Sequence, residues 1–216
     1  HLDRGTPFGF PIQVRQEPHI LGTGGGIKNT ADFWDRDPFL VMNVDILTDM
    51  PLDPALVMHK KSGRLVTLIL HDCPEFNQIR VNSGLEILEI DHRPGPGKLA
   101  FTGIHIMDPA FLDHIPQGRS SDIVDCYRKA IEKGEPIGAY IFQGHAWRDV
   151  GTVGSYVQAN RECLRRKGQN VSIGSHCRID PSARLKDWAV IGPQCRLERN
   201  VTVSRSILWE AVQVAP

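Results

Sequence analysis

Two aspartates stand where a metal-dependent enzyme would hold its ion. Asp45 ends the apolar run PFLVMNVD at residues 38–45, and Asp149 precedes a Gly-Thr turn in HAWRDVGT at residues 145–152. Each closes a predicted strand, and ligands of open α/β sheets bind at the carboxyl ends of strands. Two carboxylates at one sheet edge would hold Mg²⁺, which in turn favours phosphate oxygens. We therefore predict a Mg²⁺ site at Asp45 and Asp149, although either aspartate alone also suits a turn or a helix cap.

A run of glycines in HILGTGGGIKN, residues 19–29, is the second feature with chemical potential. It follows an apolar stretch and precedes a predicted helix, as a phosphate-binding loop does. It matches neither the dinucleotide nor the P-loop pattern, because Ile27 and Lys28 follow the glycines. A phosphate cradle, a close approach of backbone to a ligand and an ordinary tight turn all remain open.

The elements that position these residues alternate between strands and helices. Asp53-Pro54 opens a helix that Gly63 ends, Ser121 caps a second helix, and Thr152 caps a third. Such alternation is typical of a mostly parallel sheet covered by helices, so the predicted class is α/β. The predicted strands are residues 12–15, 39–45, 65–71, 79–82, 85–91 and 139–142.

A six-residue repeat begins after Gly168. One register holds mainly large aliphatic residues and the other, two positions earlier, mainly smaller ones, a pattern typical of a parallel β-helix. The predicted domains are therefore residues 1–168 and 169–216. The first register is Ile173, Ile179, Leu185, Ile191, Leu197, Val203 and Trp209; the second is Val171, Cys177, Ala183, Ala189, Cys195, Val201 and Ile207.

Composition excludes several classes of protein. The chain has 216 residues, and its 25 basic residues balance 25 acidic ones, so no strong overall charge attracts nucleic acid or a membrane surface. No apolar run approaches the roughly 20 residues of a membrane-spanning helix. Five cysteines without a C-x-x-C pair argue against a disulfide framework and a zinc site, and favour a cytoplasmic setting.

Four motifs in order resemble the sugar-1-phosphate nucleotidylyltransferases. They are EPHILGTGGGI at residues 17–27, FLVMNVDILTD at 39–49, FTGIHIM at 101–107 and WRDVGTVGSYVQAN at 147–160, followed by the hexapeptide repeats. Mannose-1-phosphate guanylyltransferases and N-acetylmuramate-1-phosphate uridylyltransferases are the most similar members. The resemblance implies a Rossmann-like nucleotidyltransferase domain, a left-handed β-helix, and transfer of a nucleoside monophosphate from a nucleoside triphosphate to a sugar 1-phosphate.

The resemblance also implies roles for individual residues. Asp45 and Asp149 would bind the catalytic Mg²⁺. Glu17 would lie at the base edge, where a carboxylate accepts from two donors of guanine but only one of uracil, so GTP is slightly favoured over UTP. The other implied substrate-binding residues are Gly22 and Thr23 beneath the base, Asn43 in the strand-end motif, and Thr102 and Gly103 on the sugar side.

The chain departs from the family pattern at two motifs. Val44 replaces the usual glycine of N-G-D, which places a side chain beside the ligand. The family's E-K-P becomes His92-Arg93-Pro94, so Arg93 would meet the sugar phosphate with a bidentate fork, and Lys98 is the reserve candidate. A solvated loop cation is the alternative for both.

The family's G-x-G-T-R-x-x-P segment, which wraps the triphosphate, has no counterpart in residues 1–10. We therefore expect the first two β-α units to be missing and this N-terminally truncated chain alone to be inactive. Two other functions remain open: an acyltransferase with His176 as general base, and a non-catalytic regulatory or scaffold homologue. In each case we expect self-association through the β-helix, as a homo-oligomer.

Overall fold

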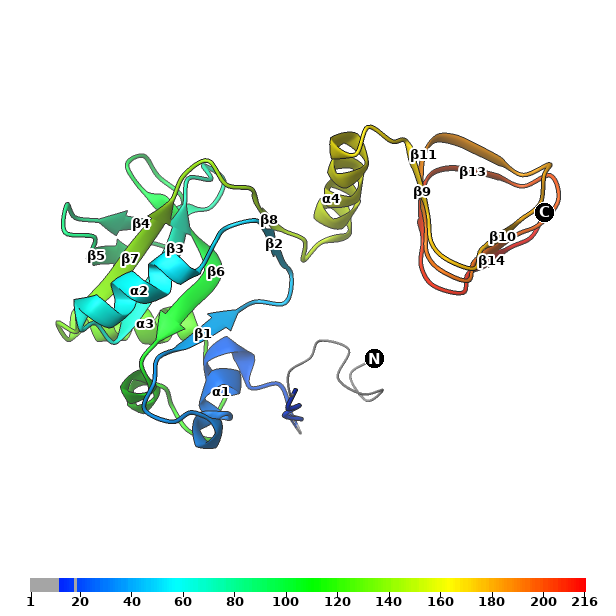
Figure 1. Cartoon of the computed structure of the whole chain (residues 1–216). Coiled ribbons are helices and arrows are strands. Elements are labelled where there is room, and N and C mark those ends of the chain that lie inside the picture. The colour runs from blue at the N-terminus through cyan, green and yellow to red at the C-terminus, as the bar shows by residue number, and fades with distance from the viewer. Residues whose placement is uncertain (1–11, 18) are drawn as a thin grey trace. The chain divides into compact units, whose positions relative to one another are not determined.

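The computed structural model describes residues 12–17 and 19–216, in two compact units (Figure 1). The first unit comprises the described residues up to Val44 together with Thr48–Trp147, and the second comprises Asp45–Leu47 and Arg148–Pro216. The prediction that a triphosphate-binding segment is missing concerns residues 1–10, which lie outside the described residues. The predicted division at residues 168 and 169 stays a prediction.

A six-stranded sheet forms the centre of the first unit. Its strand order is β5-β4-β6-β3-β7, with β1 paired to β6. Only β3 and β7 pair in parallel, whereas β6 runs antiparallel to β1, β3 and β4, and β4 antiparallel to β5. The strands are β1 (Phe39–Met42), β3 (Val66–His71), β4 (Asn77–Val81), β5 (Ile87–Ile90), β6 (Leu99–Met107) and β7 (Ile137–Phe142).

The sheet is therefore mixed, not mostly parallel as predicted. The difference arises at β6, which the strand predictions left out although it is the longest strand of this sheet and pairs with three others. The prediction of a strand at residues 12–15 was also wrong, since these residues are in no strand. Their alternating pattern finds no partner strand among the described residues. The remaining predicted strands overlap observed ones.

Helices α2 (Asp53–Ser62) and α3 (Ile123–Glu132) cover opposite faces of this sheet (Figure 1). The first five residues of β3 are fully buried, because both of its faces are covered. Helix α2 ends at Gly63, which has a φ of 65°. Helix α3 is capped by Asp122, which accepts from the Val124 N–H, so the predicted cap Ser121 was one residue too early.

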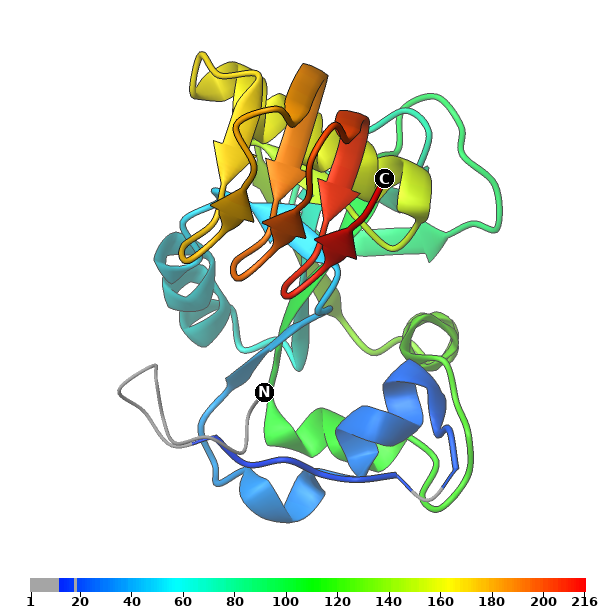
Figure 2. The same cartoon turned by 90° about the vertical axis from the view of Figure 1, so that its right-hand side faces the viewer.

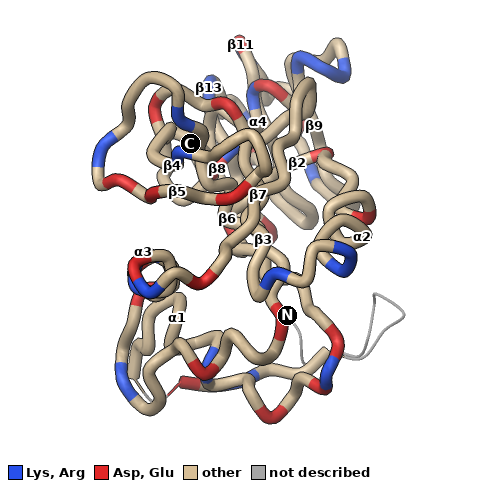
Figure 3. The backbone as a smooth tube through the Cα atoms, turned by 90° about the vertical axis from the view of Figure 1, so that its left-hand side faces the viewer, with Lys and Arg blue, Asp and Glu red and all other residues tan. Residues whose placement is uncertain are grey.

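The remaining helices of the first unit are short. They are α1 (Gly22–Lys28) and the 3₁₀ helices η1 (Ala31–Phe33) and η2 (Pro109–His114). Figure 3 shows basic and acidic residues interspersed along the helices and loops of this unit, as the balanced composition predicts. No helix among the described residues is both long and apolar enough to cross a membrane.

The second unit contains helix α4 (Val153–Arg166) and two parallel three-stranded sheets (Figure 2). Thr152 caps α4 as predicted and forms a capping box with Ser155. The sheet orders are β13-β11-β9 and β10-β12-β14. The strands are β9 (Val171–Ile173), β10 (Arg178–Ile179), β11 (Arg184–Ile191), β12 (Arg196–Leu197), β13 (Thr202–Leu208) and β14 (Gln213–Val214).

Successive strands in these sheets pair at an offset of 18 residues, as in Arg178 with Arg196. Beyond Ser204 the offset falls to 17, because residues 187 and 188 stand opposite the single residue Arg205. Ile191 consequently pairs with Leu208, and the predicted registers were wrong at their last members, Ile207 and Trp209. Trp209 is 69% exposed, while Val212 and Val214 pack against the core of this unit.

His105 makes the first unit sensitive to acid. Its side chain is buried on β6, and neither ring nitrogen has a hydrogen-bond partner among the described residues. Burial lowers its pKa from 6.5 to about 3. The unfolded chain therefore binds a proton that the folded chain excludes, so the stability that this residue provides above pH 6.5 is lost as the pH falls from 6.5 towards 3.

We expect His105→Phe to flatten the dependence of stability on pH. Between pH 6.5 and pH 5 the wild type should lose about 2 kcal/mol more free energy of unfolding than the variant. Urea unfolding at both pH values measures this difference. His92→Asn, which removes an exposed histidine, is the control and should behave as the wild type. Equal slopes for wild type and His105→Phe would contradict the prediction.

Candidate active site

A bulge in β6 anchors two of the sequence motifs at one point. Residues 102–104 of β6 stand opposite Ile69 alone, and Gly103 adopts a φ of 75°, which favours glycine. The buried Thr102 hydroxyl donates to the Ile69 carbonyl at 2.8 Å. The carbonyls of the bulge consequently point to other partners: that of Thr102 accepts from Trp147 Nε1 at 2.9 Å, and that of Gly103 from the Asn43 N–H at 3.0 Å.

These two anchored residues stand at equivalent places in their motifs. Asp45 follows Asn43 by two residues, and Asp149 follows Trp147 by two. The segments beyond the anchors pair with each other as strands β2 (Ile46–Thr48) and β8 (Trp147–Asp149). Within the second unit, the Val150 N–H donates to the Asp45 carbonyl at 2.8 Å. The chain thus brings the two aspartates together as predicted, although 104 positions separate them in the sequence.

Gly151 shows how close the two carboxylates are. A Cβ added at Gly151 would lie 2.9 Å from Asp45 Oδ2 and 3.1 Å from Asp149 Oδ1, so both oxygens border one small space that only glycine leaves open. The Gly151 N–H also donates to Asp149 Oδ1 at 2.8 Å. Two converging carboxylate oxygens are a donor set that suits a hard divalent cation, which completes its shell with water and phosphate.

Arg148 fixes the strand that carries Asp149. Its guanidinium donates to Glu162 Oε2 at 2.6 Å and to Gln158 Oε1 at 3.2 Å, which ties β8 to helix α4. Glu162 also accepts from Arg166 at 3.0 Å. The hydrogen bonds from Arg148 and Arg166 lower the pKa of the Glu162 carboxyl. Sequence analysis missed this role; the long-range pair joins a strand to a helix and leaves no local pattern.

Asp49 was missed as well. Its Oδ1 accepts from the Ala146 N–H at 2.8 Å and lies 3.4 Å from His145 Nδ1. The Thr48 hydroxyl donates to the Ala146 carbonyl at 2.7 Å, so two side chains from one segment hold the segment that enters β8. Asp49 is the second aspartate of NVDILTD and was visible in the sequence. Its partner, however, is a backbone group far along the chain.

The glycine run lies inside helix α1 and not before a helix as predicted, and it packs against the chain itself. A Cβ at Gly22, which has a φ of 70°, would lie 2.7 Å from the Ser121 carbonyl oxygen, and the Gly24 N–H donates to that same oxygen at 2.9 Å. At Gly25 an added Cβ would lie 2.9 Å from the Arg119 carbonyl oxygen. The glycines therefore allow α1 to lie directly on the backbone that precedes α3.

Two polar residues of the same motif have partners within the first unit. Glu17 Oε2 accepts from the Leu21 N–H at 3.0 Å, and its Oε1 would lie 2.9 Å from a Cβ at Gly26. Thr23 Oγ1 accepts from the Ile123 N–H at 3.0 Å, at the start of α3. Each residue thus has a structural contact, and the predicted contacts with a base stay predictions.

The two candidate cations differ in their surroundings. Lys98 Nζ pairs with Asp91 and lies 3.9 Å from Glu89, with only 9% of its side chain exposed. Its charge is therefore neutralised by the protein. Arg93 is exposed and has no hydrogen bond or ion pair among the described residues. Of the two cations, only Arg93 is therefore available to an anion.

Val44 is the most exposed large apolar residue in the described part of the chain. Its relative exposure is 103%, although its neighbour Asn43 is held by Gly103. An isopropyl group on a fully exposed turn stabilises nothing in the folded chain by burial. The side chain is thus available to contact a ligand, as expected for a residue that replaces the usual glycine.

Comparison with known proteins gives the following matches. A family model described as "Nucleotidyl transferase" matches residues 1–166. A UTP–glucose-1-phosphate uridylyltransferase of Synechocystis sp. is 26% identical, over 98% of this chain and 68% of its own length. A mannose-1-phosphate guanylyltransferase of Mycobacterium tuberculosis is 28% identical, over 97% of this chain and 63% of its own length. The chain thus spans about two thirds of the length of these relatives.

A similar fold occurs in a crystal structure of a Bacillus anthracis protein, assigned as a glucose-1-phosphate thymidylyltransferase and solved in complex with sucrose. The TM-score is 0.64 at 21% sequence identity, over 74% of this chain and 68% of that one. At this identity the likeness establishes the fold alone.

The contact of Asp49 with Ala146 leads to a test of the β2–β8 pairing. Asp49→Ala removes the acceptor of the Ala146 N–H, so that amide should exchange with solvent severalfold faster, whereas Asp49→Asn keeps an acceptor oxygen and most of the protection. The Ala146 N–H, and secondarily His145, lower the pKa of Asp49 below 3.8. Protection should thus be present above pH 3.8 and weaken below it in the wild type only.

Hydrogen exchange followed by mass spectrometry on peptides that contain residue 146 measures this protection. Asp53→Ala, at the first residue of α2, is the matched carboxylate control and should leave the peptide unchanged. Unchanged exchange in Asp49→Ala would show that the backbone pairing alone holds β8.

Proposed function

Because this chain belongs to the nucleotidyl transferase family, we propose that the protein transfers a nucleoside monophosphate from a nucleoside triphosphate to a sugar 1-phosphate. The products are a nucleoside diphosphate sugar and pyrophosphate. A phosphate oxygen of the sugar 1-phosphate attacks the α-phosphorus, forming one P–O bond, while the bond to the β-phosphate oxygen breaks and its electron pair leaves with pyrophosphate. This displacement requires no covalent intermediate on the protein.

One observation carries the proposal: the carboxylates of Asp45 and Asp149 converge on the space above Gly151. Two acidic side chains that border one open space repel each other unless a cation lies between them. We propose that they hold Mg²⁺. When bound, the ion neutralises phosphate charge and aligns the reacting oxygens. The Gly151 N–H keeps Asp149 oriented by its hydrogen bond to Oδ1.

The nucleotide is proposed to lie at the start of helix α1 in the first unit. Gly22 is only partly buried, and the Glu17 carboxylate stands beside it through its hydrogen bond from the Leu21 N–H. A carboxylate accepts from both the N1–H and the exocyclic amine of guanine, so GTP is favoured over UTP. The relatives are named as uridylyl- and guanylyltransferases, and both nucleotides belong in a test.

The sugar 1-phosphate is proposed to meet the β6 bulge and the loop at residues 92–94. Gly103 keeps the bulge free of a side chain, and Arg93 offers a planar guanidinium that suits two phosphate oxygens at once. Val44 adds apolar surface where the family has glycine, so it should influence which sugar is accepted. Lys98, already paired with Asp91, would act only indirectly on this loop.

For the repeats of the second unit we propose a left-handed β-helix through which the protein forms a homo-oligomer. The parallel pairing of its sheets, at offsets of 18 and then 17 residues, and its buried core of Ala189, Ile191, Cys195, Leu197, Val201 and Val203 support this proposal. The five cysteines are free thiols, which supports a reducing, cytoplasmic setting.

The two other functions have less support. A scaffold homologue has no need to keep two carboxylates beside a glycine, and their convergence favours an enzyme. The acyltransferase hypothesis depends on His176, which is exposed on a turn with a φ of 60° and has no carboxylate partner among the described residues to orient it as a base.

A substrate panel tests the reaction. Pyrophosphate release is measured on the natural full-length protein with GTP, UTP, ATP and dTTP against glucose, mannose and N-acetylhexosamine 1-phosphates. We expect Mg²⁺-dependent release with at least one pair, and at least about a hundredfold lower rate for Asp149→Asn. Circular dichroism establishes that the variant folds. Release that is independent of Asp149 in a folded variant, or none with any pair, would overturn the proposal.

Gly151 allows the metal site to be tested separately in this chain. Gly151→Ala places a methyl group within about 3 Å of both carboxylate oxygens, so it should weaken Mn²⁺ binding by about tenfold or more. Gly154→Ala is the matched control, because its methyl would meet only Thr152 Oγ1 at 3.9 Å. Electron paramagnetic resonance titration with Mn²⁺ measures both. Equal affinity in the two variants would exclude a metal at this space.

A further inference from the structure

Strands β10 and β12 of the β10-β12-β14 sheet carry two rows of charge on their outer face. In the first row, Arg178 pairs in register with Arg196, so two cations stand side by side on neighbouring strands. Directly after the ends of these strands stand Asp180 and Glu198, which form a second, negative row. The residues between the rows, Ile179 and Leu197, point into the core of the unit. The outer face is therefore striped, positive and then negative.

Such a stripe costs stability in an isolated unit. In-register residues on neighbouring strands lie about 5 Å apart, and like charges at that separation repel. The face offers little compensation: Arg196 Nε reaches Glu198 Oε1 only at 3.8 Å, and Arg178 has no ion pair among the described residues. Glu198 is bonded instead to Gln213 Nε2, at 2.7 Å. The arginine row is thus left without close acidic partners.

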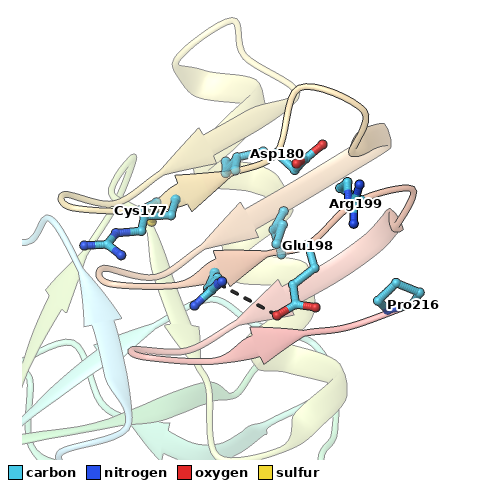
Figure 4. A pocket seen from close by; sticks show the side chains of 9 residues that line it. Cys177, Asp180, Glu198, Arg199 and Pro216 are labelled. Atoms are coloured by element: carbon cyan, nitrogen blue, oxygen red, sulfur yellow. Dashed lines mark ion pairs between the residues drawn. The ribbon is translucent and has the colours of Figure 1, made fainter.

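Both rows border one groove of about 710 Å³ (Figure 4). In Figure 4 the Arg196–Glu198 pair is the only ion pair drawn among the lining residues. Asp180 is held in place by the Ser182 N–H and hydroxyl, at 2.9 and 2.6 Å. The groove is thus lined by charged groups that the unit itself positions but does not pair closely.

We propose that this striped face binds the same face of a second copy of the chain. A two-fold axis that runs parallel to the rows and midway between them places each arginine row opposite the acidic row of the other copy. Arg178 then faces the partner's Asp180, and Arg196 faces the partner's Glu198. Both contacts occur twice, as an isologous interface requires. The inference rests on the self-association proposed above and names the surface and geometry that produce it.

The alternation of sign is what selects this occupant. A polyanion or a phosphorylated ligand that bound the arginine row would be repelled by the acidic row beside it. A cationic peptide that bound the acidic row would be repelled by the arginine row. A second copy satisfies both rows at once, because the pattern is its own complement under that rotation. Any other two-fold axis in the plane, such as one parallel to the strands, would oppose like charges.

Charge exchange within one facing pair tests the geometry. Arg196→Glu and Glu198→Lys are made singly and together, and the dissociation constant of the self-complex is measured by sedimentation velocity at fixed ionic strength. Each single variant opposes like charges twice in its homodimer, so we expect at least about tenfold weaker association. In the double variant each facing pair again joins an acid to a base, with the signs reversed, so association should return to within about threefold of the wild type.

An equimolar mixture of the two single variants gives a second readout. Its heterodimer joins the introduced carboxylate of one copy to the introduced ammonium group of the other, and a native Arg196 to a native Glu198, so it should associate as tightly as the wild type. Arg184→Glu is the control, because it makes the same charge change at an exposed position on the other sheet and should have no effect.

Several results would overturn the proposal: a monomeric wild type, single variants that associate normally, failure of the mixture to restore association, or an equal loss in Arg184→Glu. If circular dichroism shows that a single variant does not fold, the self-association of the wild type is measured at low and high NaCl concentration. Association that does not weaken with salt would also contradict the proposal. Mn²⁺ binding and pyrophosphate release report the proposed transferase activity separately, so either proposal can fail alone.

Discussion

The bulge in β6 is the constraint that holds the two residues from which the aspartate-bearing segments start. Because Gly103 takes a left-handed conformation, the carbonyls of Thr102 and Gly103 are released from the sheet and accept from Trp147 and Asn43. These are the residues two positions before Asp149 and Asp45. The pairing of β2 with β8 and the tie from Arg148 to Glu162 then hold the strand that bears Asp149. Within the second unit, these last two interactions and the hydrogen bond from the Val150 N–H to the Asp45 carbonyl hold the segments that bear the two carboxylates.

Glycine acts in two different ways in this protein. At Gly22 and Gly24 the missing side chain allows helix α1 to lie on the backbone of Ser121, and the benefit is structural. At Gly151 the missing side chain leaves a space between two acidic groups, and nothing in the described part of the protein fills it. A space that is bordered by carboxylates and kept open at the expense of chain entropy is the one suited to a cation. This contrast separates the glycines that serve packing from the one proposed to serve chemistry.

The register of strand pairing determines which side chains of the second unit lie inside and which lie outside. Its strands pair at offsets of 18 residues and then 17, which keeps aliphatic residues inside and places Arg178 beside Arg196 outside. The alignment of these two like charges is a consequence of repetition, since β12 repeats the positions of β10. The arginine pair lacks a close acidic partner within one copy and would gain one from a second copy at the proposed interface. The same regularity that builds the core therefore also shapes the proposed interface.

The sequence by itself determined the family, since four local motifs carry it and the family match confirms them. It also determined the helices that end at Gly63 or begin at Thr152, because caps act over a few residues. It named Asp45 and Asp149, but not Gly151, Asp49 or Arg148, whose roles depend on partners elsewhere in the chain. The antiparallel direction of β6 and the one-residue shift of register at Arg205 were decided only in the tertiary structure. Strand direction and register depend on which neighbour a strand finds, and a single strand's residues do not encode that choice.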